Sequence, residues 1–210
     1  MTVDAMDELK SLLQKSGISM ESRAAEQLTL YLALLTKWNS RVNLTARSDW
    51  TTIGPLFREG IWASGFLPAS RCALLDIGSG AGFPAIILRI LAPGVRLEMI
   101  ESRAKRAAFL ETAASELGLE DTLVHSARLD EHLGKSARTW DYITWKGLRI
   151  KSSELLQLRD HSHGQTQFWM FHGRELAVED AEAMGLLMKR VRSEKCPGRE
   201  NWTLSMYIPR

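Results

Sequence analysis

The stretch Leu74-Leu-Asp-Ile-Gly-Ser-Gly-Ala-Gly-Phe-Pro84 reads as a buried strand, a glycine loop and the start of a helix. Gly78, Gly80 and Gly82 predict a tight turn whose backbone can approach a ligand closely. A loop that cradles a nucleoside triphosphate needs Gly-Lys-Ser/Thr, but here Phe-Pro follows the last glycine, which argues against such hydrolysis. The spacing G-x-G-x-G also differs from the G-x-G-x-x-G of dinucleotide-binding loops.

Strands and helices alternate outward from this loop. The expected strands are 72–77, 96–101, 122–126, 141–145 and 165–171, and the expected helices are 83–91, 104–117, 152–159 and 175–190. This alternation predicts an α/β fold with a doubly wound, mostly parallel sheet. Segments 191–196 and 201–208 flank Pro-Gly-Arg-Glu with no helix between them, which predicts a C-terminal antiparallel hairpin.

A helical extension is expected before the sheet. A short amphipathic helix ends at Gly17, and Ser19 is positioned to cap the next helix. In that second helix, apolar residues recur at three- and four-residue spacing from Leu28 to Trp38, as in a helix packed on a core. A third helix is expected from Asp49 toward Ser64. The sequence therefore predicts a helical region at 1–66 and an α/β domain at 67–210.

Composition limits the classes of protein to consider. The 210 residues are 45% hydrophobic and 25% charged, which is typical of a globular protein, and the net charge is +2. No apolar run approaches the about 20 residues of a membrane span, and the acidic N-terminus does not resemble a secretory signal. We therefore expect a cytoplasmic protein without a membrane segment, and favour a monomer. Cys72 and Cys196 lack metal-ligand spacing and predict no disulfide framework.

Two carboxylates flank the loop in a pattern that suggests a ligand. Asp76, two residues before the first glycine, would repel a pyrophosphate and attract a cation. Glu101 ends the second strand, where an acid can accept hydrogen bonds from ribose hydroxyls. A cationic group and a ribose together describe S-adenosylmethionine. The alternative is an ordinary turn in which Asp76 caps a helix and Glu101 is solvated.

Two motifs make the sequence resemble a known family. Trp38-Asn-Ser-Arg-Val-Asn-Leu-Thr45 resembles the Trp-Asn-x-x-x-Asn-Leu-Thr signature of the RsmG (GidB) family, and Asp76-Ile-Gly-Ser-Gly-Ala-Gly-Phe-Pro84 resembles its cofactor loop. Members are bacterial methyltransferases that modify N7 of a guanine in small-subunit ribosomal RNA. The resemblance spans residues 28–184. It implies a class I Rossmann-like methyltransferase fold, S-adenosyl-L-methionine as cofactor, and 16S rRNA in the small ribosomal subunit as partner.

The resemblance also implies site residues. The cofactor-binding set is Asp76, Gly78, Ser79, Gly80, Gly82, Phe83, Glu101, Arg128, Leu129, Asp130 and Lys146. Lys146 is also expected to position the reacting groups, and no residue is assigned a catalytic role, because the exposed lone pair of guanine N7 needs no general base. The residues expected to contact RNA are Arg106, Trp145, Arg149 and His172. Trp145 either stacks on a flipped base or packs in the core.

Several positions depart from the family pattern. Lys146 stands where the family usually has Arg, and His172-Gly173 stands where it has Lys-Gly. Arg58-Glu-Gly-Ile-Trp-Ala-Ser64 occupies a region where the family has His and Asp-Ser, and Leu129 replaces a small residue beside the adenine. Because of these departures, an alternative function remains: a non-catalytic RNA-binding or ribosome-assembly protein that retains the cofactor pocket. A nicotinamide oxidoreductase is a further alternative, against which Asp76 counts.

No metal site is expected. His125, His132, His161 and His163 lack ligand spacing and are interpreted as surface or loop residues, and the pair His161 and His163 is only a weak metal motif.

Overall fold

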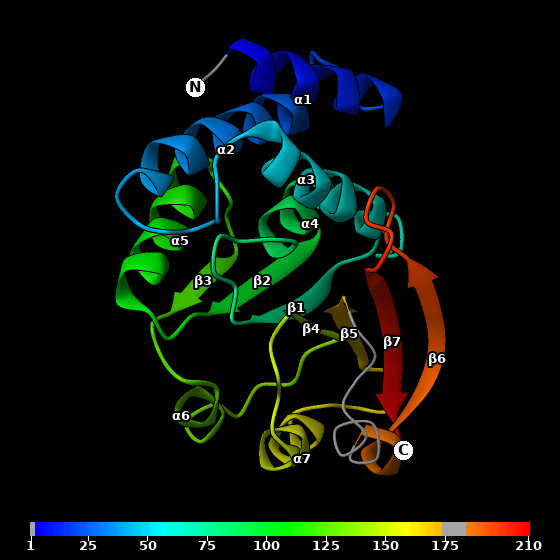
Figure 1. Ribbon diagram of the computed structural model, residues 1–210. Coiled ribbons are helices and arrows are strands. Elements are labelled where there is room, and N and C mark those ends of the chain that lie inside the picture. Colours follow the sequence, from blue (N-terminus) through cyan, green and yellow to red (C-terminus); the bar gives the residue numbers. More distant parts are fainter. Residues whose placement is uncertain (1–2, 174–183) are drawn as a thin grey trace.

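The computed structural model describes residues 3–173 and 184–210 (Figure 1). Within these residues, one seven-stranded sheet has the order β3-β2-β1-β4-β5-β7-β6. Strands β3, β2, β1, β4 and β5 are mutually parallel, whereas β7 runs antiparallel to both β5 and β6. The predicted doubly wound sheet with its C-terminal antiparallel hairpin is thus confirmed.

The strands are β1 (Cys72–Ile77), β2 (Val95–Ile100), β3 (Thr122–His125), β4 (Tyr142–Lys146), β5 (Gln167–His172), β6 (Met188–Lys195) and β7 (Thr203–Pro209). All six residues of β1 are buried, as expected for a central parallel strand covered on both faces. The strand ends lie within two residues of the predictions for β1 to β5.

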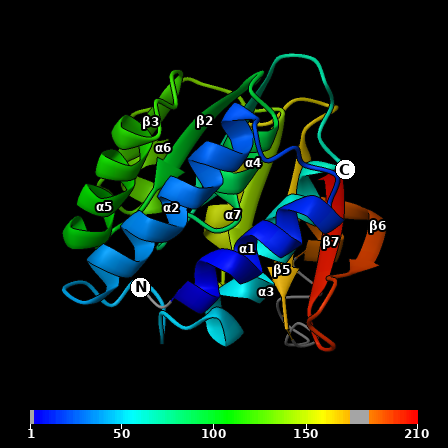
Figure 2. The same ribbon diagram turned by 90° about the horizontal axis from the view of Figure 1, so that it is seen from above.

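Helices cover both faces of the sheet (Figures 1 and 2). One face carries α1 (Val3–Lys15), α2 (Arg23–Asn39), α3 (Trp50–Ser64), α4 (Ala85–Leu91) and α5 (Ala104–Glu116), which share one hydrophobic core with the sheet. The other face carries α6 (Leu129–Leu133) and α7 (Ser152–Asp160), which enclose a second core. The sequence did not predict the short helix α6. Among the described residues, none of the helices combines the length and the apolar character needed to cross a membrane.

The N-terminal helices begin with capping side chains. The third helix starts where it was predicted, and Asp49 caps it, because its carboxylate accepts a hydrogen bond from the Thr52 amide at 3.0 Å. The predicted cap of α2 at Ser19 is wrong. Ser22 caps this helix by accepting from the Ala25 amide at 3.2 Å, since residues 19–22 form a turn first. The division into 1–66 and 67–210 stays a prediction.

The predicted helix 175–190 lies partly outside the described residues, and its last three residues are a strand. β6 begins at Met188, where the backbone pairs with Pro209 of β7, and Arg190 pairs with Tyr207. Met184 and Met188 are buried and four residues apart, a spacing that suits a helix, while Arg190 faces solvent. Pairing with β7 therefore decides the conformation of a charged segment that resembles a helix in sequence.

Candidate functional site

A cleft of about 610 Å³ opens at the carboxyl ends of the central parallel strands. Its walls come from the loop after β1, residues 101–103 and 106 after β2, residues 127–130 before and within α6, and residues 146–151 after β4. In doubly wound sheets this end of the strands is where ligands bind. The cleft is therefore the candidate functional site.

In the glycine loop, the backbone takes conformations that only glycine adopts readily. Gly78 and Gly80 have φ values of +67° and +56°. The amides of Gly78 and Ser79 donate to the Ile100 carbonyl at 2.8 and 3.1 Å, so the turn is tied to the end of β2. A Cβ on Gly78 would lie 3.0 Å from the side chain of Leu148 on the opposite wall. A glycine at position 78 thus leaves room for Leu148, while close approach of a ligand stays a prediction.

Glu101 lies at the lip of the cleft in a fixed orientation. Its side chain lines the cleft, and the residue is only 5% exposed. Oε2 accepts a hydrogen bond from the Gly80 amide at 2.9 Å, and Oε1 accepts from the Arg103 amide at 2.8 Å. Each carboxylate oxygen retains a further lone pair for a ligand hydroxyl. The carboxylate thus joins the glycine loop to the start of α5 and remains able to accept from a ligand.

Asp76 lies beneath the loop and does not line the cleft. Its Oδ1 accepts a hydrogen bond from the Thr144 hydroxyl at 2.6 Å, and its Oδ2 is buried without a partner among the described residues. Burial raises the pKa of Asp76 to about 6, outweighing the hydrogen bonds from Thr144 and Ser79 and the charge of Lys146. Asp76 can therefore act on a ligand only through its electrostatic field, because it lies below the loop and does not contact the cleft.

A buried ionic cluster closes the cleft on the β4 side. Lys146 lines the cleft and forms an ion pair with Glu59 of α3, whose carboxylate is fully buried. Arg199 donates to the other oxygen of Glu59 at 3.2 Å. The two cationic groups lie 5.5 and 3.8 Å from the ring centroid of Trp202. Burial lowers the pKa of Lys146, and the charge of Glu59 opposes this effect.

Sequence reasoning missed three members of this cluster: Glu59, Arg199 and Trp202. The available signal was indirect. The resemblance implies departures from the family pattern at Lys146 and in the segment that contains Glu59. The structure shows that these two departures are in contact.

The expected cofactor residues fall into two groups. Those that line the cleft are Gly78, Glu101, Arg128, Leu129, Asp130 and Lys146. Those that do not are Asp76, Ser79, Gly80, Gly82 and Phe83. The Phe83 ring instead lies 5.3 Å from that of Tyr31 and 5.4 Å from that of Phe57. Tyr31 also donates a hydrogen bond to the Ala81 carbonyl at 2.6 Å, so this aromatic group supports the loop from the helical side.

Of the residues expected to contact RNA, some line the cleft and others do not. Arg106 and Arg149 line the cleft, and Arg106 donates to the Asn43 carbonyl at 2.6 Å. His172 is half-buried, with Nε2 3.0 Å from the Ser205 hydroxyl. Trp145 is only 2% exposed and belongs to the core beneath α7, so the expectation that it stacks on a base is wrong and the packing alternative holds.

The Trp38–Thr45 motif forms a turn that supports the cleft from outside. The Asn39 side-chain oxygen accepts hydrogen bonds from the Leu44 and Thr45 amides, both at 2.9 Å. The Trp38 ring packs on Phe109 of α5 with centroids 5.7 Å apart. Arg106 lies on the same helix and donates to the backbone of this turn. The motif therefore holds Arg106 in place at the cleft.

The sheet order, the antiparallel β7 and the cleft beside a glycine loop define a Rossmann-like methyltransferase fold. A solved structure of a ribosomal protein L11 methylase from Lactobacillus delbrueckii subsp. bulgaricus has this fold, with a TM-score of 0.59 and 18% identity. The match covers 72% of this chain and 77% of that one.

The family follows from sequence comparison. The model of the GidB family, described as rRNA small subunit methyltransferase G, matches residues 24–196, and the chain belongs to this family. A ribosomal RNA small subunit methyltransferase G from Roseiflexus sp. (strain RS-1) is 35% identical over 92% of this chain and 82% of its own length. One from Streptococcus pyogenes serotype M5 (strain Manfredo) is 36% identical over 57% of this chain and 52% of its own length.

Proposed function

We propose that this protein transfers a methyl group from S-adenosyl-L-methionine to N7 of a guanine in 16S rRNA of the small ribosomal subunit. Family membership supports the reaction class. The observation that carries the cofactor assignment is Glu101, a carboxylate oriented by two backbone amides on the wall of the cleft. A ribose diol is the ligand group that such an acceptor suits.

The residues around the cleft fit this cofactor. Gly78 lines the cleft without a side chain, and a Cβ there would crowd Leu148 on the other wall. The unpartnered Oδ2 of Asp76 contributes negative charge below the loop, which suits a ligand with sulfonium and ammonium groups. Leu129 offers an apolar surface to a base, beside the polar side chains of Arg128 and Asp130.

The protein's part in the reaction is to hold the reacting groups in line. When bound, S-adenosyl-L-methionine supplies an electrophilic methyl group. Guanine N7 attacks through its own lone pair, so the side chains need only orient the two reactants and exclude competing geometries. Glu101 fixes one reactant at the ribose. Lys146 lines the cleft at the end of β4 and is held there by its ion pair with Glu59, so it can orient a reactant on that side.

The arginines at the cleft supply the attraction for RNA. The net charge of +2 gives little long-range field, so binding depends on local groups such as Arg106 and Arg149. If Z phosphates are neutralised, the logarithm of affinity falls with log salt by about 0.7Z for single-stranded RNA. A measured slope near zero contradicts this role for the arginines.

The decisive experiment is methyl transfer from labelled S-adenosyl-L-methionine to small ribosomal subunits that lack the modification, with mapping of the labelled nucleotide by mass spectrometry. We expect one labelled guanine that carries its methyl group on N7. Transfer to another atom contradicts the proposed substrate. Binding of the cofactor and of RNA without transfer instead supports the second candidate, a non-catalytic RNA-binding protein, which the commitment of Lys146 to Glu59 favours.

A further inference from the structure

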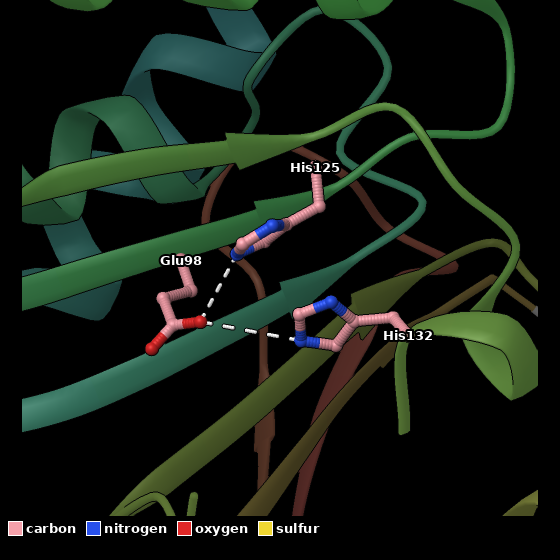
Figure 3. Close-up of side chains that lie close together, drawn as sticks. All are labelled: Glu98, His125 and His132. Carbon is pink, nitrogen blue, oxygen red and sulfur yellow. Dashed lines mark hydrogen bonds and ion pairs between the residues drawn. The ribbon is translucent and has the colours of Figure 1, made fainter. Parts of the chain in front are cut away.

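Glu98, His125 and His132 come together on the α6 side of the sheet, away from the cleft (Figure 3). Glu98 lies on β2, His125 ends the neighbouring β3, and His132 lies on α6. Their nearest ligand atoms all lie within 4.8 Å of one another. None of the three lines the cleft, so the cluster is separate from the site described above.

Both imidazoles are directed at one carboxylate oxygen. His125 Nε2 lies 3.1 Å and His132 Nε2 lies 4.0 Å from Oε2 of Glu98, as the dashed lines in Figure 3 show. The rings lie against each other with centroids 4.2 Å apart. In a tetrahedral zinc site with bonds of about 2.0–2.1 Å, ligand atoms are about 3.3 Å apart. The two measured separations lie on either side of that value.

The other carboxylate oxygen of Glu98, Oε1, is hydrogen-bonded to two further side chains. Glu98 Oε1 accepts hydrogen bonds from Arg138 at 2.6 Å and from the indole of Trp140 at 3.3 Å. These contacts fix the carboxylate plane and leave Oε2 facing the imidazoles. Partners of this kind, behind a ligating group, orient ligands in known metal sites.

The cluster is incomplete without a further group. The Nε2 atom of His132 is buried and has no hydrogen-bond partner among the described residues, although buried polar atoms are nearly always paired. Burial and the neighbouring His125 lower the pKa of His132, and the neutral imidazole is the form that binds metals. A cation between the rings and Oε2 would satisfy all three groups.

We propose that Glu98, His125 and His132 form a binding site for a zinc ion. Two imidazoles and one carboxylate are a ligand set that zinc accepts, with a fourth position open to water. The ion joins β2, β3 and α6, three elements far apart in the sequence. Residues 127–130 of the cleft wall lie between the two histidine ligands, so the ion also restrains that wall. Sequence spacing alone could not reveal this site, because its ligands come from separate elements.

The test is zinc binding by the full chain with no tag and no added cofactor. Zinc content after dialysis is measured by mass spectrometry, and affinity is measured by calorimetric titration with Zn²⁺. We expect one zinc ion per chain. His132→Gln and Glu98→Gln should each weaken binding by at least about tenfold, as loss of a ligand should cost no less than loss of an outer-shell partner.

A control variant and a conservative ligand variant make the zinc-binding result decisive. His163→Gln is the matched control, because His163 pairs with Asp141 outside the cluster, and it should bind zinc like the parent. Glu98→Gln retains an oxygen that can accept from Arg138 and Trp140, so it tests ligation in a folded protein even if His132→Gln unfolds. A parent that binds no zinc, or a Glu98→Gln variant that binds it equally well, overturns the proposal.

Discussion

Lys146 of β4, which lines the cleft, forms an ion pair with Glu59 of α3; the Glu59 side chain is fully buried and the Lys146 side chain is 14% exposed. The pair connects a helix of the N-terminal region to the end of a central strand, 87 residues further along the chain. Arg199, from the turn before β7, shares the same carboxylate. One buried acid thus fixes two cations beside the cleft.

The first prediction concerns the stability of this cluster. Glu59→Ala leaves Lys146 buried without its counter-charge, so the free energy of unfolding should fall by about 3–5 kcal/mol. The measurement is urea unfolding followed by circular dichroism. Glu194→Ala is the matched control, because Glu194 pairs with Arg192 on the surface and should cost about 0–1 kcal/mol. Equal effects of the two substitutions contradict a structural role for Glu59.

A double variant separates charge from packing. Glu59→Leu with Lys146→Met removes both charges and retains apolar volume, so it should be more stable than Glu59→Ala alone. If the double variant is as unstable as the single one, the loss comes from packing around α3.

The second prediction concerns turnover. Lys146→Ala should lower the rate of methyl transfer to small subunits in single-turnover experiments at saturating cofactor, with less effect on cofactor affinity. Lys146→Arg should preserve or raise the rate, because Arg offers a planar fork that can also bind Glu59. Lys10→Ala on α1 is a matched loss of an exposed lysine and should leave the rate unchanged. If Lys146→Ala transfers the methyl group at the same rate as the parent protein, Lys146 has no positioning role.

The sequence predicted the glycine loop and Glu101 because their signals are local. A run of apolar residues, alternate glycines and an acid at the end of the next strand follow from the chain order of a parallel sheet. The two strands beside the loop, β1 and β2, accordingly match their predicted bounds to within one residue.

The side-chain clusters could not be predicted in the same way. Glu59, Lys146 and Arg199 meet only after α3, β4 and the β6–β7 turn have packed together. Trp145 and Lys146 are adjacent in sequence, yet strand geometry directs them to opposite faces of the sheet. The Trp145 ring consequently lies in the core while Lys146 reaches the cleft, a difference that residue type does not reveal.

The third prediction tests Glu101 as the ribose acceptor. Glu101→Ala should weaken S-adenosyl-L-methionine binding by about 1.5–3 kcal/mol, roughly 10- to 150-fold, the scale of hydrogen bonds to a charged group. Affinity is measured by calorimetry. Because Glu101 also accepts from the Gly80 and Arg103 amides, Glu101→Gln is included to retain one acceptor oxygen for the loop.

Controls separate ligand contacts from loop folding. Glu111→Ala removes an exposed acid from α5, the helix that follows Glu101, and should leave affinity unchanged. Thermal unfolding without ligand reports any loss of loop structure. Unchanged affinity in Glu101→Ala contradicts the ribose assignment.

The fourth prediction follows from the raised pKa of Asp76. Its pKa is about 6 in the folded protein against a usual value of 3.8. The folded state therefore holds this proton more tightly, so the contribution of Asp76 to stability is greatest below pH 3.8 and declines as pH rises to 6. The loss is about 3 kcal/mol, at 1.36 kcal/mol per unit of pKa shift. Asp76→Asn cannot ionise and can still accept from Thr144, so its stability relative to the parent should rise by most of that amount between pH 4 and pH 7. Urea unfolding at several pH values, without added ligand, measures the difference, and Asp7→Asn on the exposed surface of α1 should show no such trend. A parent and an Asp76→Asn variant whose stabilities differ by the same amount at every pH would mean that Asp76 ionises in the folded protein as it does in the unfolded chain.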